Sequence, residues 1–158
     1  MKIRAVLPGS YDPVTRGHLD VIRRAAAVFG PVEVLVMDNR EKKYRFSAEE
    51  RLALCRAALE GEKDVSVSYF DGMLWEYMRD RRPGAVLVKG VRNGEDLAYE
   101  RLQADFNFAH CGAETAFLDA RDEFRELSST RVREALSKNE GWEALVPEKI
   151  VTILRGKL

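Results

Sequence analysis

Hydrophobic and polar positions along this chain form two alternating kinds of segment. Five apolar runs have the length of strands, and they lie at residues 3–7, 32–37, 65–70, 85–88 and 115–118. Most of these runs are rich in valine and leucine and lack polar alternation, which is typical of a parallel sheet covered by helices on both faces. Between the runs, apolar residues recur at helical spacing, as at Leu19, Ile22, Ala26 and Phe29. The pattern predicts alternating strands and helices.

Signals for helix ends agree with this alternation. Ser47 followed three residues later by Glu50 is the spacing of a capping box and predicts a helix start. Gly30 is expected to end the first helix, and Asn93 to begin a helix that Gly112 closes.

The chain changes character after the fifth apolar run. From Ser128 onwards it is expected to form helical pieces, with Gly141 interrupting one and Pro147 opening the last. We therefore predict an α/β fold in one domain spanning residues 1–158, a doubly wound, five-stranded parallel sheet of Rossmann-like type with C-terminal helices.

Composition restricts the function classes. The 26 basic and 26 acidic residues of the 158 balance, so no global field would attract nucleic acid or an anionic membrane, and any anion site must be local. No apolar stretch reaches the roughly 18 residues of a membrane span. The two cysteines, Cys55 and Cys111, fall in helical segments, which favours reduced thiols and a cytoplasmic protein.

Chemistry is expected where strands end, because doubly wound sheets bind ligands beyond the carboxyl ends of their strands. Residues 8–18 follow the first strand, residues 39–43 the second and residues 89–92 the fourth. These three clusters should meet in one crevice.

The residues in these clusters suit a phosphate group. Gly9 allows a tight turn, and His18 stands in the first turn of the next helix, whose free N–H groups favour anions. A lone histidine is more often structural, and a basic loop such as that around Lys42 is more often solvated, but both lie on the expected ligand edge. The hydroxyls at residues 128–130 are by themselves a common helix start.

Several familiar site types are absent from the sequence. Neither the G-x-x-x-x-G-K-[ST] nor the G-x-G-x-x-G phosphate motif occurs, Ser10 is not in a G-x-S-x-G elbow, and no Cys/His spacing suggests zinc.

Four motifs in order resemble those of bacterial phosphopantetheine adenylyltransferases, within the nucleotidyltransferase α/β phosphodiesterase superfamily. They are P-G-S-Y-D-P…T-R-G-H at residues 8–18, K-K…F-S-A-E-E-R at 42–51, K-G-V-R…D-L-A-Y-E at 89–100, and L-S-S-T-R-V-R at 127–133. The likeness covers residues 3–136, nearly the whole chain.

This resemblance implies a nucleotidyltransferase fold and the transfer of AMP from ATP to 4′-phosphopantetheine, which gives 3′-dephospho-coenzyme A and pyrophosphate. The reaction needs no covalent enzyme intermediate. The resemblance also implies Mg²⁺ held mainly by phosphates and water rather than by protein ligands, a homohexamer built as a dimer of trimers, and coenzyme A as a candidate feedback ligand.

The resemblance also assigns residues. It gives catalytic roles to Ser10, His18 and Lys42, and it gives contacts with the acceptor substrate to Ser10, Lys42, Leu74 and Lys89. The residues it assigns to ATP are Ser10, Tyr11, His18, Gly90, Val91, Arg92, Glu100, Phe124, Arg125, Glu126, Leu127, Ser128, Ser129 and Thr130.

Some positions depart from the family pattern. Lys89 stands where an arginine is common, Leu97 where a phenylalanine is common, and Arg125 with Glu126 where an aromatic residue is common. Lysine replaces a bidentate fork by a point charge, so the acceptor contact at Lys89 is expected to be weaker or bridged by water.

Two alternatives remain open on the sequence. A sister transferase could use another phosphate acceptor, such as nicotinate mononucleotide or glycerol phosphate. A signalling receiver domain shares the fold class, and Asp71 could serve as its phosphoacceptor, but Ser10 and Tyr11 stand where a receiver needs acidic residues.

Overall fold

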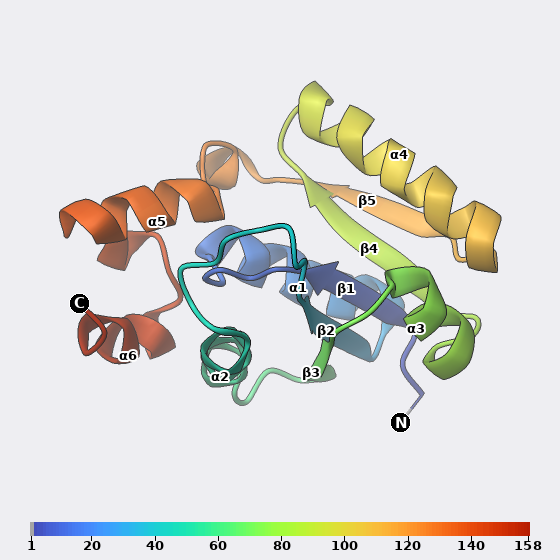
Figure 1. Ribbon diagram of the computed structural model, residues 1–158, viewed down its shortest axis with the longest axis horizontal. Coiled ribbons are helices and arrows are strands. Elements are labelled where there is room, and N and C mark those ends of the chain that lie inside the picture. The colour runs from blue at the N-terminus through green and yellow to red at the C-terminus, as the bar shows by residue number, and fades with distance from the viewer. Residues whose placement is uncertain (1) are drawn as a thin grey trace.

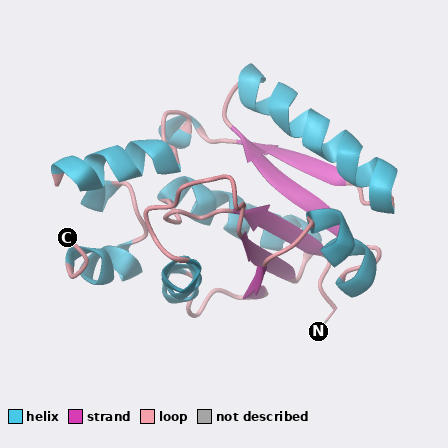
Figure 2. Ribbon diagram, in the orientation of Figure 1, coloured by secondary structure: helices cyan, strands magenta, loops and turns pink. Residues whose placement is uncertain are grey.

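The computed structural model describes residues 2–158 as an open sheet of five parallel strands in the order β3-β2-β1-β4-β5 (Figures 1 and 2). The strands are β1 (Ala5–Gly9), β2 (Val32–Met37), β3 (Val65–Phe70), β4 (Val86–Val91) and β5 (Thr115–Asp119). The predicted α/β fold is thus confirmed. The strand order reverses between β1 and β4, which is where a doubly wound sheet opens a crevice.

A helix follows each of the first four strands. The helices are α1 (Arg16–Phe29), α2 (Ala48–Ala58), α3 (Leu74–Arg81), α4 (Gly94–Cys111), α5 (Ser129–Lys138) and α6 (Val151–Arg155), with short 3₁₀ turns at Asp122–Phe124, Trp142–Ala144 and Glu148–Ile150. None of the helices in residues 2–158 is both long enough and apolar enough to cross a membrane.

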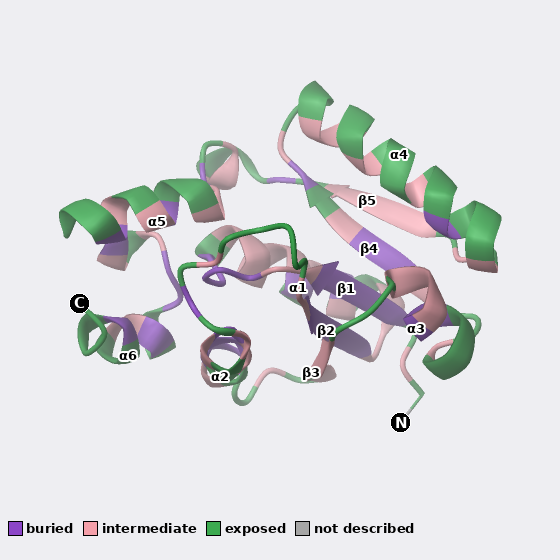
Figure 3. Ribbon diagram, viewed as in Figure 1, coloured by how far each residue is buried: buried purple, intermediate pink, exposed green. Residues whose placement is uncertain are grey.

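Alternate residues of each strand feed two separate hydrophobic clusters, because successive strand side chains point to opposite faces. In β1, Leu7 joins a large cluster built with α1, α2, α5 and the C-terminal segment, while Val6 joins a smaller cluster with Tyr77 and Met78 of α3. Figure 3 shows the central strands buried and the outer faces of the helices exposed. The sheet is therefore covered on both faces, as the valine-rich runs predicted.

Strands β1 and β4 extend further at their carboxyl ends than the apolar runs indicated. Strands β2 and β3 have the predicted bounds, whereas β1 extends through Pro8 and Gly9, which pair with Leu35 and Val36. Strand β4 likewise extends to Val91. The sequence pattern missed these strand ends because proline and glycine usually indicate a turn. Here these residues belong to the strands, since the neighbouring strands supply the pairing.

The predicted helix ends are largely confirmed. Ser47 and Glu50 form the capping box of α2, Asn93 caps α4, and Gly30 and Gly112 end α1 and α4 with φ of 91° and 73°.

The C-terminal segment differs in one detail. Helix α5 ends at Asn139, whose φ of 50° is left-handed, two residues before Gly141. Pro147 precedes the turn Glu148–Ile150 that leads into α6.

Strands β1 and β4 are joined over a short length. Their register pairs only Ala5 with Val86 and Val6 with Leu87, whereas β1 and β2 pair from Ala5 to Gly9. Beyond Val6 the strands are no longer in register pairs, and the loop after β1 separates from β4. This divergence opens the crevice at the carboxyl edge of the sheet.

Candidate active site

Three cavities line this carboxyl edge. The largest, about 670 Å³, lies between the loop after β2 and helices α3 and α4. A second of about 400 Å³ lies over the end of β1 and the start of α5, and a third of about 170 Å³ lies between α1, β4 and the segment Phe124–Ser129. We refer to them as the outer, central and inner cavities.

The three cavities meet through shared residues, so they form one cleft. The outer and central cavities share four polar residues, Ser10, Lys42, Lys89 and Glu100. The central and inner cavities share His18 and Arg92. The three clusters predicted from strand ends thus meet in one place, with His18 at one junction and Lys42 at the other.

His18 is fixed in place by the start of α1. Thr15 caps this helix, its hydroxyl accepting from the backbone N–H of His18 at 3.2 Å, and the backbone N–H of Thr15 donates to His18 Nδ1 at 3.0 Å. This is a capping box in which a histidine takes the usual place of glutamate. With Nδ1 accepting, the neutral ring carries its proton on Nε2, as inferred from the hydrogen bonds.

The imidazole of His18 is neutral near pH 7. Burial lowers its pKa from 6.5 to about 4, and the positive charges of Lys89 and Arg92 add to that shift. A neutral imidazole donates one hydrogen bond from Nε2 without placing a full charge in the apo cleft. A bound phosphate would favour the protonated form and raise this pKa.

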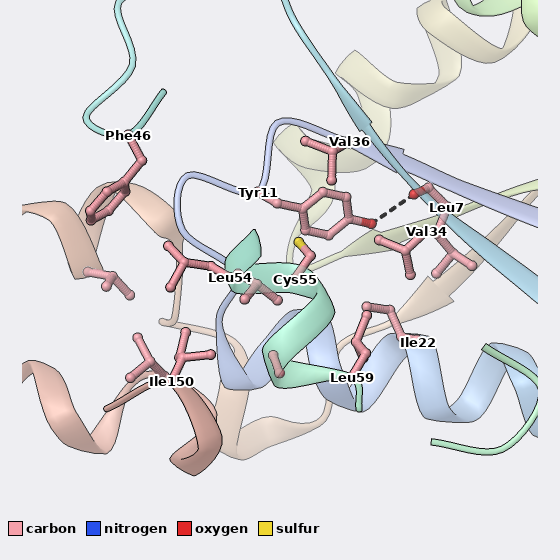
Figure 4. Packing of buried hydrophobic residues seen from close by; sticks show 14 of the residues in the cluster. Leu7, Tyr11, Ile22, Val34, Val36, Phe46, Leu54, Cys55, Leu59 and Ile150 are labelled. Carbon is pink, nitrogen blue, oxygen red and sulfur yellow. Dashed lines mark hydrogen bonds between the residues drawn. The ribbon is translucent and has the colours of Figure 1, made fainter. Parts of the chain in front are cut away.

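The side chain of Tyr11 packs against the imidazole ring of His18. Its hydroxyl donates to the carbonyl oxygen of Leu7 at 2.8 Å, and its ring packs edge-on against His18 with centroids 4.9 Å apart. Figure 4 shows Tyr11 among Leu54, Cys55 and the strand residues of the large hydrophobic cluster. Its side chain is therefore part of the core as well as of the cleft floor.

The junction of the outer and central cavities joins two loops. The hydroxyl of Tyr44 lies 3.5 Å from that of Ser10 and accepts the backbone N–H of Asn39 at 2.7 Å. Lys42 is exposed between Asn39 and Tyr44, in a turn closed by its own N–H to the carbonyl oxygen of Asn39. The lysine is thus presented at the cleft by a hydrogen-bonded loop.

Two cations, Lys89 in β4 and Arg92 just after it, are paired with acids of α4. Lys89 Nζ lies 3.4 Å from a carboxylate oxygen of Glu100, and Arg92 Nε donates to Asp96 at 3.1 Å. All four residues line the central cavity. Each pair is electrically neutral, so a bound phosphate would have to compete with Glu100 for Lys89 and with Asp96 for Arg92.

The start of α5 closes the cleft from the other side. Ser128 caps the helix, Ser129 donates its hydroxyl to the carbonyl oxygen of Pro13 at 2.9 Å, and Arg133 donates to Thr130 Oγ1 at 3.0 Å. Ser128 and Ser129 line both the central and the inner cavity, and Thr130 the central one. Their backbone N–H groups lie at a helix N-terminus, which favours anions.

Comparison with known proteins decides the family. A family model described as cytidylyltransferase-like matches residues 6–135. A phosphopantetheine adenylyltransferase of Pseudarthrobacter chlorophenolicus is 42% identical over 149 residues, covering 94% of this chain and 89% of the relative. One from Symbiobacterium thermophilum is 43% identical over 156 residues, covering 98% and 96% of the two chains.

The chain belongs to the phosphopantetheine adenylyltransferase family. It is accordingly a nucleotidyltransferase, and the family resemblance read from its motifs is confirmed.

This member of the phosphopantetheine adenylyltransferase family brings most of its predicted site residues to the cleft. Leu74 lines the outer cavity, Gly90 the central and inner cavities, and Val91, Phe124 and Leu127 the inner one.

Arg125 and Glu126 are exceptions, since they line none of the three cavities. Arg125 instead makes a two-pronged ion pair with Asp119 and a further one with Asp122. In this member of the family, the two departures lie beside the cleft.

The carboxylates around the central cavity decide whether the protein itself could hold a metal ion there. Within residues 2–158, no three histidine, cysteine, aspartate or glutamate side chains gather as a metal site. The carboxylates that line the central cavity are already engaged: Asp12 accepts the backbone N–H groups of Arg45 and Phe46, and Asp96 and Glu100 pair with cations.

Two residues of the cleft lie in the sequence motifs but were assigned no role from them. Thr15 orients His18, and Arg133 lines the central cavity and donates to the carbonyl oxygen of Asp12 at 2.9 Å. Arg133 lies three and four residues after Thr130 and Ser129, so helical spacing alone could have placed it on their face.

Proposed function

We propose that this chain transfers AMP from ATP to the phosphate of 4′-phosphopantetheine, giving 3′-dephospho-coenzyme A and pyrophosphate. An oxygen of the acceptor phosphate forms a bond to the α-phosphorus of ATP, and the bond from that phosphorus to the bridging oxygen of pyrophosphate breaks. The observation that carries this proposal is the cleft itself. It joins a nucleotide-sized pair of cavities to a larger cavity through a junction that includes Ser10, Lys42 and Lys89.

The outer cavity suits a long acceptor. Its volume of about 670 Å³ and its lining of Leu74, Trp75 and Phe106 opposite polar loop residues match an extended arm with apolar and polar parts. Glycerol phosphate, a small polar molecule, would fill only a small part of a cavity of this size. The cavity therefore favours the pantetheine acceptor over that sister activity.

Catalysis in this proposal depends on holding two anions together. Lys42, Ser10 and Lys89 neutralise and orient the acceptor phosphate, which reduces its repulsion from the triphosphate. His18 donates from Nε2 to the α-phosphate and stabilises the charge that develops there in the transition state. No side chain needs to form a bond to substrate.

A magnesium ion is proposed to enter with ATP, held by phosphate oxygens and water. When bound, such an ion neutralises charge on the departing pyrophosphate. The engaged carboxylates of Asp12, Asp96 and Glu100 support an arrangement in which the protein supplies no carboxylate ligand.

The proposed activity is tested by a screen of acceptors. Purified protein is incubated with Mg²⁺, ATP and one of 4′-phosphopantetheine, nicotinate mononucleotide or glycerol phosphate, and released pyrophosphate is measured. CTP replaces ATP in a parallel set. Pyrophosphate release that requires both ATP and 4′-phosphopantetheine supports the proposal, and release with another acceptor only would assign the chain to a sister activity.

Assembly into a homohexamer is proposed as well. Helix α4 carries four large apolar side chains that are exposed in one chain: Tyr99, Leu102, Phe106 and Phe108 are 62%, 69%, 43% and 55% exposed, and Tyr99 and Phe106 also line the outer cavity. Neighbouring exposed apolar residues of this size mark contact surfaces between proteins.

Feedback by coenzyme A is proposed because it shares the pantetheine arm of the acceptor, and adding it to the pyrophosphate assay tests this.

A further inference from the structure

Helix α2 holds an arginine whose charged end lies wholly inside the protein. Arg51 exposes 0% of its surface. Its Nε donates to the carbonyl oxygen of Phe46 at 3.2 Å, and its Nη1 donates to those of Ser10 and Met37, each at 2.9 Å. Its Nη2 pairs with the carboxylate of Asp38. A single guanidinium thus has four hydrogen-bond partners.

These partners come from three separate segments of the chain. Ser10 follows β1, Met37 and Asp38 end β2, and Phe46 closes the loop 39–46. A buried guanidinium is stable only when its donors are satisfied. The three segments must therefore keep the relative positions that satisfy Arg51.

A tyrosine extends this connection to the outer side of the same loop. The guanidinium carbon of Arg51 lies 3.9 Å from the centre of the Tyr44 ring, within range of a cation–π interaction. The hydroxyl of Tyr44 in turn contacts Ser10 and Asn39. The loop that presents Lys42 is consequently attached to Ser10 through both Arg51 and Tyr44.

We propose that Arg51 is a positioning residue that sets the separation of Ser10 and Lys42 and so shapes the site for the acceptor phosphate. This inference rests on the proposed function. Arg51 lines none of the outer, central and inner cavities, so it acts on the substrate only through the groups it holds.

The acceptor side should depend on this positioning more than the ATP side. Lys42 is exposed on a loop, and a mobile loop would lose much of the rate gained by orienting two mutually repelling phosphates. His18, by contrast, is fixed by Thr15 at the start of α1, and Arg51 makes no bond there.

The test is Arg51→Lys, which keeps the charge but cannot reach four partners from one ammonium group. The expected result is a fall of at least about tenfold in kcat/KM for 4′-phosphopantetheine, with the Kd of ATP measured without acceptor changing by less than about twofold. The matched control is Arg56→Lys, the same change at an exposed position of the same helix, which should leave both quantities unchanged.

A double-mutant cycle separates positioning from a general loss of structure. If Arg51 acts through the loop of Lys42, then Arg51→Lys should cost less than about threefold once Lys42→Ala is present, because coupled residues are not additive. Should Arg51→Lys fail to fold, Tyr44→Leu is compared with Tyr44→Phe, since both lack the hydroxyl that contacts Ser10 and Asn39 but only Tyr44→Leu also loses the ring over the guanidinium. Tyr44→Leu should then lower the same kcat/KM by about threefold or more relative to Tyr44→Phe.

Three results would overturn the inference: additive losses in the cycle, an equal loss of ATP affinity, or full activity of Arg51→Lys. Activity of Tyr44→Leu equal to that of Tyr44→Phe would overturn it where Arg51→Lys does not fold. Failure of the proposed function looks different, because the unmodified protein would then release no pyrophosphate with ATP and 4′-phosphopantetheine.

Discussion

His18 serves the fold and the cleft with different atoms of one ring. Nδ1 completes the capping box with Thr15, while Nε2 is left to donate in the cleft between the central and inner cavities. The structural and the functional interpretation of this histidine are therefore compatible, and the cap fixes the tautomer that the proposed chemistry uses.

Two substitutions separate these roles. His18→Asn keeps an acceptor near the position of Nδ1 but has no donor at the position of Nε2, so kcat should fall at least about a hundredfold with little change in ATP affinity. His18→Gln carries a donor that reaches as far as Nε2 and should retain more activity than His18→Asn. Steady-state rates with calorimetric ATP binding measure this, and equal activity of the two variants would contradict the assigned donor.

The pKa of His18 gives a second prediction at the residue scale. In the free protein, the imidazole resonance should titrate near pH 4 by NMR, since burial and then Lys89 and Arg92 lower its pKa. Lys89→Met should raise the pKa only in part, because burial is the larger cause. The kcat/KM profile should therefore show no His18 titration between pH 5 and 8, and an acid limb near 6.5 that moves with this residue would contradict it.

At the scale of elements, a buried carboxylate fastens α3 to the sheet. Glu33 of β2 is 1% exposed and accepts from Tyr77 at 2.6 Å, from Ser68 at 2.8 Å and from two nitrogens of Arg82. Helix α3 begins with Leu74, which lines the outer cavity. This network therefore holds one wall of the cleft.

Glu33→Gln should lower the free energy of unfolding by about 2–3 kcal/mol at pH 7, somewhat below the cost of breaking a fully buried pair because Arg82 is partly exposed. Burial alone would raise the pKa of Glu33, but the bonds from Arg82, Tyr77 and Ser68 outweigh it and lower the pKa. The stabilisation is therefore complete above the ordinary value near 4.5 and is lost as pH falls through the lower folded value.

Urea unfolding at pH 7 and pH 3.5 measures this effect. The matched control is Asp80→Asn, which removes an exposed carboxylate from α3 and should leave the midpoint unchanged. A stability difference between the unmodified protein and Glu33→Gln that grows as pH falls would have the wrong sign and refute the account.

Local signals in the sequence were sufficient for most elements. Ser47, Asn93 and Gly112 act within a few residues of themselves, so their caps could be predicted without tertiary structure. The extension of β1 through Pro8 and Gly9 could not be predicted, because it depends on pairing with β2. The hydrophobic pattern predicted that helices cover both faces of the sheet, but it could not predict the order of the strands.

The sequence predicted the edge of the sheet at which the cleft lies, but not the contacts between side chains and backbone that hold it together. Strand ends identified His18, Lys42, Lys89 and Arg92, and the resemblance gave His18 its specific contact with the α-phosphate. Arg51 was part of the E-E-R motif, yet nothing local shows that its guanidinium bonds to Ser10, 41 residues away in sequence. Bonds between distant segments exist only once the fold brings the segments together.

At the scale of the whole molecule, the prediction about assembly concerns the exposed apolar side chains of α4. Leu102 is 69% exposed and lines none of the three cavities, so Leu102→Glu places a charge on this surface without altering the cleft lining and should convert the proposed hexamer into smaller species by light scattering after size exclusion. Val28→Glu is the control, since Val28 is equally exposed at 69% but lies on α1. A molecular mass of one chain for the unmodified protein would contradict the proposed assembly.

The pairing between β1 and β4 spans only two register pairs, and the proposed nucleotide site lies where the two strands have separated. A nucleotide that contacts His18 at the start of α1 and Arg92 after β4 would bridge the two sides of the cleft. Amide hydrogens along residues 86–88, where the two strands pair, should then exchange with solvent more slowly once the nucleotide is bound.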